Sequence, residues 1–313
     1  MKLLKKLEPG DTIGIIAPSS GAINENGYYD YISKYLEERG YKVKLGKSFS
    51  AKKGYLAGPD ELRINDIHLM FSDKEVKAII FLRGGYGLSR IVDKLDYELI
   101  KNNPKIISGY SDITVLLNNV FQKCDFVTIH GLISQYLGTE KYLNDSDTKN
   151  DFINILTKYQ KNRILKPLKS NTCECKTFIP GKCKGKLVGG NLSLISTLNG
   201  TPYEVDFTDK IVFIEDVGER PYAIDRYLCA LRLRGALDKA KGFIFGYFTD
   251  CNPADDLVTV MDVLNDYILP LNKPTIINFT SGHEFPFVSL PIGAMVELDS
   301  DRLEIKICEE IYE

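Results

Sequence analysis

At 313 residues the chain is long for a single hydrophobic core and long enough for two domains. Apolar residues make up 44% of it and charged residues 26%, a composition that excludes a disordered or fibrous protein. Forty basic and forty-two acidic residues give a net charge of −2, so no positive excess is available to bind nucleic acid or an anionic membrane surface.

The first half of the chain alternates short apolar runs with amphipathic stretches, a pattern typical of a parallel, doubly wound α/β sheet. Ligands bind to such sheets beyond the carboxyl ends of the strands, so the loops after the strands are where functional residues are expected. Strands are predicted at 12–17, 41–45, 76–82, 105–108 and 126–129, and helices at 28–39, 59–71, 89–101, 113–123 and 148–159.

A polar, basic stretch at 158–172 interrupts this alternation and indicates a crossing between domains. We therefore predict an N-terminal α/β domain over 1–160, a linker over 161–175 and a C-terminal α/β domain over 176–313. In the second domain strands are expected at 210–214, 242–248 and 275–279, helices at 191–198, within 223–240 and at 256–269, and a terminal hairpin at 295–298 and 303–307.

The seven cysteines are an odd number and mostly isolated in sequence, which predicts reduced thiols rather than disulfides. Cys173, Cys175 and Cys183 cluster, but no fourth ligand lies at a zinc-site spacing, so no metal site is expected. No stretch has the pattern of a signal peptide or the length of a membrane span. The sequence thus predicts a cytoplasmic protein.

Ser111 stands where the apolar run 104–109 breaks into Tyr110, Ser111 and Asp112, just ahead of the helix expected at 113–123. A serine on a sharp strand-to-helix turn exposes its hydroxyl, while the first amides of the new helix can face an oxyanion. Ser111 is therefore a candidate nucleophile. The alternative that Ser111 or Asp112 only caps the helix stays open, because both residue types are common caps.

A serine nucleophile needs a base, and the chain contains three histidines. His68 lies within an amphipathic helix and is set aside. His130 ends a predicted strand near the Ser111 edge, where it could shape a pocket or form a core hydrogen bond. His283 follows the strand at 275–279 in a polar turn with Gly282, so it is the strongest candidate for the base.

Glu215 and Asp216 are the first polar residues after the apolar strand that begins at 211. A carboxylate at the end of a buried strand needs a partner, and His283 could be that partner. Three alternatives stay open: a salt bridge of either carboxylate with Arg220 or Arg226, a helix cap by Asp216, or an orienting role for Glu219 instead.

The loop 83–87, Arg-Gly-Gly-Tyr-Gly, follows the strand expected at 76–82. Its glycines can present backbone amides either to a phosphate or to an oxyanion near the serine. No G-x-G-x-x-G follows the first strand and no P-loop motif occurs, so no nucleotide cofactor is expected.

Six motifs in this order resemble the L,D-carboxypeptidase family of serine peptidases, which also contains the microcin C self-immunity peptidases. The similarity runs nearly from end to end. The motifs are residues 10–18, 83–87, 109–112, 189–192, 213–219 with 221–222, and 281–284.

The resemblance implies that Ser111 is the nucleophile, His283 the general base and Glu215 the acid that orients it. It also implies an oxyanion hole made by the backbone amides of Gly85 and Asp112. The implied fold has a flavodoxin-like first domain with the serine and a second domain with the other two residues, the active site forming where the domains meet.

The substrate implied by the resemblance is a cytoplasmic murein tetrapeptide, cut before its terminal D-alanine during cell-wall recycling by a homodimer that needs no metal or organic cofactor. Arg83, Tyr86 and His130 are candidates for binding it. Two alternatives remain. One is a microcin-type peptidase for aminoacyl-nucleotides, against which the absence of tryptophan counts. The other is a non-catalytic protein that binds an anion at the loop 83–87.

Overall fold

The computed structural model describes residues 1–21, 28–158, 160–170 and 172–313, and the chain folds as two compact units. The first unit comprises Met1–Tyr159, Ser289–Pro291 and Glu310–Glu313, and the second comprises Gln160–Val288 and Ile292–Glu309. The linker predicted at 161–175 is part of the second unit, where Ile164–Leu165 forms β6. Tyr159, the predicted end of a helix, and Asn171 of that linker lie outside the described residues.

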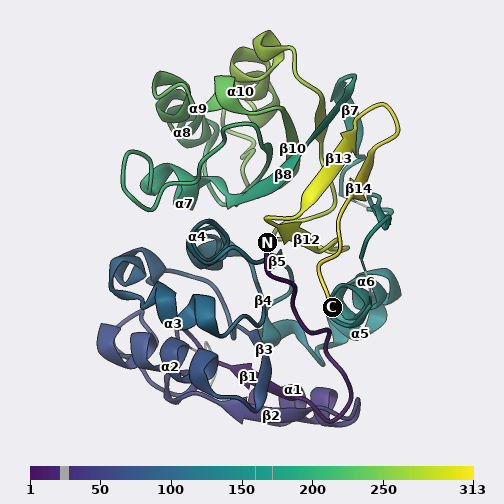
Figure 1. Cartoon of the computed structure of the whole chain (residues 1–313). Helices are drawn as coiled ribbons and strands as arrows, with labels where there is room; N and C mark the ends of the chain where they lie inside the picture. Colours follow the sequence, from purple (N-terminus) through teal and green to yellow (C-terminus); the bar gives the residue numbers. More distant parts are fainter. Residues whose placement is uncertain (22–27, 159, 171) are drawn as a thin grey trace. The chain divides into compact units, whose positions relative to one another are not determined.

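The first unit contains a six-stranded sheet in the order β12-β5-β4-β3-β1-β2 (Figure 1). Strands β1 to β5 pair in parallel, which confirms the doubly wound sheet of flavodoxin type. All four residues of β4 are buried, as expected for an interior strand of a parallel sheet. The strands are β1 (Thr12–Ile15), β2 (Lys42–Leu45), β3 (Val76–Ile80), β4 (Ile106–Gly109), β5 (Thr128–His130) and β12 (Leu290–Ile292).

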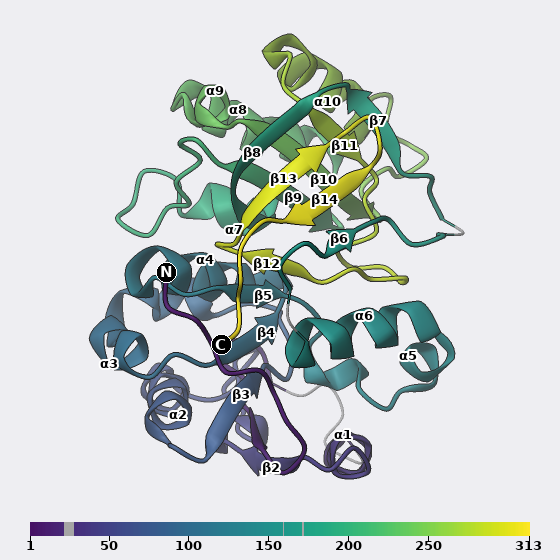
Figure 2. The same ribbon diagram turned by 45° about the vertical axis from the view of Figure 1, so that its right-hand side comes forward.

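Helices cover both faces of this sheet: Figure 2 shows α2 and α3 on one side and α1, α5 and α6 on the other. The helix predicted at 89–101 is wrong in its first part, which forms two short 3-10 turns at Leu88–Arg90 and Val92–Lys94. The α-helix starts only at Tyr97, because the Asp96 side chain caps it by accepting from Leu99 N (2.8 Å). The helices are α1 (Tyr28–Glu37), α2 (Asp60–Ser72), α3 (Tyr97–Asn102), α4 (Thr114–Cys124), α5 (Glu140–Asn144) and α6 (Ser146–Thr157).

The second unit contains an eight-stranded mixed sheet in the order β6-β14-β13-β8-β9-β10-β11-β7. Its four central strands, β8 to β11, run parallel. The terminal hairpin β13–β14 is confirmed, and its strand β13 pairs antiparallel with β8. The short strand β7 was not predicted from the sequence. The strands not yet given are β7 (Lys176–Ile179), β8 (Lys182–Asn191), β9 (Ile211–Val217), β10 (Gly242–Thr249), β11 (Thr275–Ile277), β13 (Met295–Asp299) and β14 (Glu304–Ile307).

Each parallel connection in the second unit carries helices, which are α7 (Leu192–Thr197), α8 (Pro221–Leu233) with α9 (Ala236–Lys239), and α10 (Val260–Tyr267). Figure 1 shows α8, α9 and α10 in green on the side of the sheet away from the yellow β13–β14 hairpin. The α/β architecture predicted for this part is therefore confirmed. Within the described residues, no helix combines the length and apolarity that a membrane crossing requires.

Candidate active site

Ser111 lies two residues beyond the end of β4, at the start of the 3-10 turn Ser111–Ile113 that leads into α4. Its φ of 64° falls in the left-handed region, where a serine costs about 1–3 kcal/mol. No side-chain cap is formed at the start of this turn or of α4. Neither Ser111 nor Asp112 therefore caps the helix. The turn is strained and joins a strand to a helix, as turns that expose a nucleophile do.

The glycine loop after β3 packs directly against this turn. A Cβ atom on Gly84 would lie 2.7 Å from Ser111 Cβ and 2.9 Å from Ser111 Oγ, so only glycine allows this close approach. The next glycine, Gly85, has a φ of 102° and is exposed. The loop is fixed from its other side because Ser20 N donates to Gly84 O (3.3 Å) and Tyr86 N donates to Ser20 Oγ (3.1 Å).

Asp112 is fully buried, and its carboxylate joins three strand-end loops. Its Oδ2 accepts from Ser19 Oγ (2.5 Å), after β1, and from Leu88 N (2.9 Å), after the glycine loop. Its Oδ1 is buried without a hydrogen-bond partner among the described residues. Burial outweighs these hydrogen bonds and raises the pKa of Asp112 to about 6.

Arg63, in α2, supports the same loops and was not identified from the sequence. Its guanidinium is completely buried and donates to the carbonyl oxygens of Pro18 and Gly87 (2.9 Å for Gly87) and to Asp60 Oδ1 (2.6 Å). An arginine on an amphipathic helix is ordinarily solvent-exposed, so no local pattern of residues indicates this role. Arg63 and Asp112 together hold the loops around Ser111.

The three predicted substrate-binding residues occupy different environments in the first unit. Tyr86 is 45% exposed, and its ring lies 5.8 Å from that of Tyr55. Arg83 is half-buried and donates from Nη1 to Gly21 O (3.1 Å). His130 is fully buried at the end of β5, and its ring packs edge-on against that of Tyr110, 6.0 Å away.

In the second unit the structure brings Glu215 and His283 together. His283 Nδ1 lies 2.7 Å from Glu215 Oε2, and the Glu215 side chain is completely buried. Burial acts to lower the pKa of His283, but the charge of Glu215 and the hydrogen bond to it prevail, so the pKa is raised above its ordinary value of 6.5. This arrangement orients the imidazole and leaves Nε2 as the nitrogen that can exchange a proton with a substrate group.

The loop that carries His283 is held by the neighbouring strand β10. Tyr247 N donates to Ser281 O (2.9 Å), and the Tyr247 hydroxyl donates to Pro286 O (3.2 Å). A Cβ atom on Gly282, whose φ is 133°, would lie 3.1 Å from Glu215 Oε2. A glycine at this position therefore lets the loop pass close to the glutamate.

Asp216 points away from this pair and anchors α7. Its carboxylate accepts from Asn191 Nδ2 (2.9 Å), Ser193 N (2.9 Å) and its neighbour Val217 N (2.8 Å). Burial first, and then the charge of Glu215, raise the pKa of Asp216 to about 7. Asp216 is not the N-cap of a neighbouring helix, because Asn191 is the N-cap of α7 and Arg220 that of α8; its carboxylate instead binds the backbone of Ser193 in the first turn of α7.

The other side chains considered in the sequence analysis contact different partners. Arg220 pairs with Asp255 (2.7 Å) and Asp256 (3.6 Å) rather than with the strand-end carboxylates. The Arg226 guanidinium lies over the Tyr227 ring, and Glu219 interacts with the Tyr227 hydroxyl. His68 Nε2 accepts from Asp96 N (2.9 Å).

Candidate metal ligands are not grouped in the described part of the chain: no cluster of three or more His, Cys, Asp or Glu residues could hold a metal ion. All seven cysteines are free thiols. Burial raises the pKa of Cys175 to about 12 and that of Cys183 to about 11, which makes these thiols poor ligands and nucleophiles near neutral pH.

Known proteins resemble the chain over nearly its whole length. Residues 13–131 match the LD-carboxypeptidase N-terminal domain, and residues 184–298 match the LD-carboxypeptidase C-terminal domain. A probable murein peptide carboxypeptidase of Bacillus subtilis (strain 168) is 40% identical over 302 residues, which cover 95% of this chain and 91% of the relative.

Two solved structures have the same fold. The muramoyltetrapeptide carboxypeptidase from Oxalobacter formigenes superposes with a TM-score of 0.82 at 26% identity, covering 96% of this chain and 99% of the other. The microcin C7 self-immunity protein MccF in complex with glutamyl sulfamoyl guanosine superposes with a TM-score of 0.89 at 26% identity, covering 99% of both chains.

Proposed function

Because the chain belongs to the LD-carboxypeptidase family and is a serine-type carboxypeptidase, we propose that it releases the terminal D-alanine from murein tetrapeptides. The bond cleaved joins the L-centre of the diamino acid at position three to D-alanine. The names of two relatives, a murein peptide carboxypeptidase and a muramoyltetrapeptide carboxypeptidase, support this substrate class. The observation that carries the proposal is the 2.7 Å contact between His283 Nδ1 and Glu215 Oε2, the base and orienting acid of a serine hydrolase.

In the proposed reaction Ser111 Oγ attacks the scissile carbonyl carbon while His283 Nε2 takes its proton. Glu215 keeps the proton of His283 on Nδ1 and stabilises the imidazolium that forms. The imidazolium then protonates the D-alanine amine as the carbon–nitrogen bond breaks. Water, activated by the same imidazole, hydrolyses the acyl-serine and releases the shortened peptide. The mechanism requires Ser111 Oγ and His283 Nε2 to meet during catalysis.

The backbone amides of Gly85 and Asp112 form the oxyanion hole in this proposal. Three features of the first unit support it: the left-handed φ of Ser111, the approach of Gly84 to Ser111, and the hydrogen bonds that fix both loops. Donors held in place before the reaction stabilise a developing negative charge without reorganisation.

Arg83 and Tyr86 are the substrate-binding residues that we propose on the glycine loop, with His130 shaping the site from the core. The exposure of Tyr86 and the position of Arg83 two residues before Gly85 support direct contact with a peptide. We further propose a cytoplasmic homodimer that acts in cell-wall recycling without a metal or organic cofactor; these points rest on the family resemblance.

Incubating the purified protein with a defined murein tetrapeptide and measuring free D-alanine tests the proposal. D-alanine should appear stoichiometrically with tripeptide, and Ser111→Ala should abolish its release. A Ser111→Ala protein with undiminished turnover would show that the nucleophile is another residue. A matched control is Ser146→Ala, an exposed serine at the start of α6, which should retain full activity.

A microcin-type activity is the rival within the same family, because MccF has this fold. The absence of tryptophan from this chain favours the murein substrate. Parallel assays with the tetrapeptide and an aminoacyl-nucleotide conjugate separate the two, since each activity predicts the larger kcat/KM on its own substrate. Binding of either compound without turnover would instead support an anion-binding protein.

A further inference from the structure

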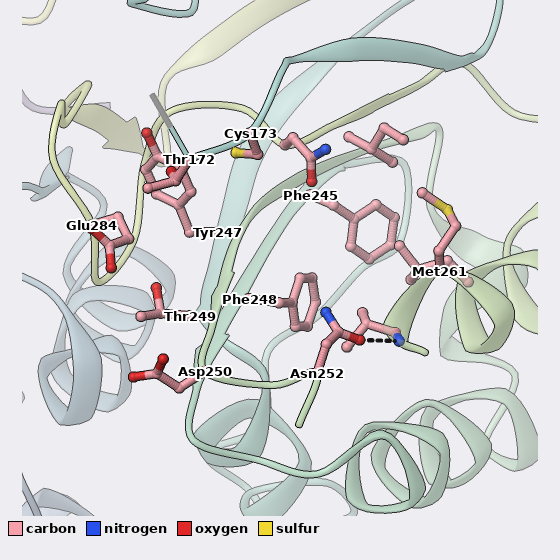
Figure 3. Close-up of a pocket in the computed structure, with 14 residues that line it drawn as sticks. Thr172, Cys173, Phe245, Tyr247, Phe248, Thr249, Asp250, Asn252, Met261 and Glu284 are labelled. Atoms are coloured by element: carbon pink, nitrogen blue, oxygen red, sulfur yellow. Dashed lines mark hydrogen bonds between the residues drawn. The ribbon is translucent and has the colours of Figure 1, made fainter. Parts of the chain in front are cut away.

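The second unit contains a cavity of about 470 Å³ between the carboxyl ends of β10 and β11 and the helix α10 (Figure 3). Its volume is in the range of small-molecule binding sites. The described residues that line it come from these elements and from two loops, and none of them is lysine, arginine or histidine.

One wall of the cavity is apolar. Phe245 and Ile277 are buried strand residues, and Met261 and Leu264 project from α10. Figure 3 shows the ring of Phe248 beside the side chain of Asn252. Such a wall stabilises methylene groups by removing them from water.

The other side of the cavity is acidic. Figure 3 shows the polar ends of Glu284, Thr249 and Asp250 gathered there. In the described residues neither carboxylate forms an ion pair with a lysine or arginine. The Thr249 hydroxyl oxygen is buried and has no hydrogen-bond partner among the residues that the structure describes. The three groups can therefore accept hydrogen bonds from a cation.

This cavity adjoins the His283–Glu215 pair within the second unit. Glu284 follows His283 in sequence and contributes to the electrostatic environment of its imidazole. Tyr247, which lines the cavity, is the residue that holds both ends of the His283 loop through Ser281 and Pro286. A group bound in the cavity would therefore lie beside the proposed general base.

We propose that this cavity binds the side chain of the diamino acid at position three, with its methylenes against Phe248 and Met261 and its ammonium at Asp250 and Glu284. This inference rests on the proposed function and specifies its substrate. A free carboxylate at the end of that side chain would face two carboxylates and no cation. The chain therefore prefers a lysine-type side chain, or one whose carboxylate is amidated, over free diaminopimelate.

Binding to the inactive Ser111→Ala protein, measured by titration calorimetry, tests the inference without turnover. Four tetrapeptides differ only at position three: lysine, norleucine, Nε-acetyl-lysine and free diaminopimelate. The lysine peptide should bind about tenfold more tightly than each of the others, as expected for one hydrogen-bonded ammonium. Equal affinities, or no binding by any of the four, would overturn the inference.

Two substitutions test whether the preference for the lysine peptide arises in the cavity. Asp250→Asn in the Ser111→Ala background should remove most of the preference for lysine, and adding Glu284→Gln should remove the rest. Asp250 is exposed and has a φ of 55°, a conformation that asparagine also tolerates, so folding should be unaffected. Glu297→Gln, at an exposed carboxylate of β13, removes the same charge elsewhere and should leave the preference intact. A preference that survives the double substitution would locate the ammonium outside the cavity.

The outcomes separate this inference from the proposed function. If the wild-type protein releases D-alanine at equal kcat/KM from the lysine and norleucine peptides, and the Ser111→Ala affinities are equal, only the inference fails. If no D-alanine is released but the lysine preference depends on Asp250, the cavity is an aminoalkyl site and the proposed function fails.

Discussion

Asp112 Oδ2 lies 2.5 Å from Ser19 Oγ, and this contact ties the residue after Ser111 to the loop after β1. The same oxygen accepts from Leu88 N, so one buried carboxylate fixes the turn that carries Ser111 and the two loops beside it. Asp112 thus has two separable roles in the proposed site: its amide is an oxyanion donor, and its side chain is a positioning group.

We predict that Asp112→Ala lowers kcat by about tenfold to a hundredfold with little change in KM, because the loop that carries Gly85 loses its anchor. Asp112→Asn should retain most of the activity, since its amide oxygen can accept from Ser19 and Leu88. Steady-state kinetics on the tetrapeptide measure both. Equal losses in the two variants would mean that the charge of Asp112, rather than its hydrogen bonds, matters.

Asp112 also predicts a pH dependence of stability. Its pKa is raised to about 6, so between about pH 4 and 6 the folded protein binds more protons than the unfolded chain. The free energy of unfolding should therefore fall as pH rises through this window, by up to about 3 kcal/mol from this group. Urea unfolding at both ends of the window should show a smaller fall for Asp112→Asn than for the wild type.

Gly84→Ala should impair catalysis more than folding. The added methyl group would lie 2.7 Å from Ser111 Cβ, so the serine or the glycine loop must move. A displacement of this size in a catalytic group costs about a hundredfold in kcat. A serine-directed fluorophosphonate should label the variant slowly while circular dichroism stays unchanged. Gly21→Ala is a control in a neighbouring loop, because among the described residues the nearest atom that its Cβ would meet across the loop is Ala51 O, 3.3 Å away. Normal labelling of Gly84→Ala would contradict the proposed position of the nucleophile.

Glu215→Gln should change both the rate and the pH profile. The general base must be neutral, so wild-type activity should fall as pH drops through the His283 pKa, which lies above 6.5. Without the charge of Glu215, burial dominates and lowers that pKa, so the acid limb should move to lower pH. The maximal kcat should fall by about 10³- to 10⁴-fold, because the preferred tautomer is lost.

Profiles of kcat/KM against pH for Glu215→Gln and for the Glu297→Gln control measure the shift of the acid limb. If the acid limb does not move in Glu215→Gln, a group other than His283 causes it.

Asn191→Ala should destabilise the second unit without abolishing chemistry. The Asn191 side chain donates to Asp216 and accepts from Leu194 N (3.3 Å) at the start of α7. Loss of a cap and of a buried hydrogen bond costs about 1–2 kcal/mol. Thr197→Ala, at the exposed end of the same helix, should cost less than about 0.5 kcal/mol. Urea unfolding compares the two, and similar values would show that the Asn191 contacts do not stabilise α7.

Local patterns in the sequence are sufficient to predict the order of the elements and the class of the fold. Apolar runs separated by amphipathic stretches of helical length permit parallel strands with helical crossovers, and both sheets contain them. Such patterns also locate the turn at Ser111 and the histidine loop, because abrupt changes from apolar strand to small polar residues are local signals. The helix predicted at 89–101 was wrong in its first part, because the cap at Asp96 starts the α-helix later than the amphipathic pattern does.

Which polar side chains meet depends on the tertiary fold. Adjacent residues of a strand point to opposite faces, so Glu215 reaches His283 while Asp216 anchors α7, and composition cannot distinguish the two. The same holds for Arg63 and Asp112, whose buried hydrogen bonds join loops up to 93 residues apart in sequence. The cavity at Asp250 and Glu284 likewise depends on strands and a helix from separate segments. Such long-range contacts follow from sheet order and strand register, which no local pattern of residues specifies.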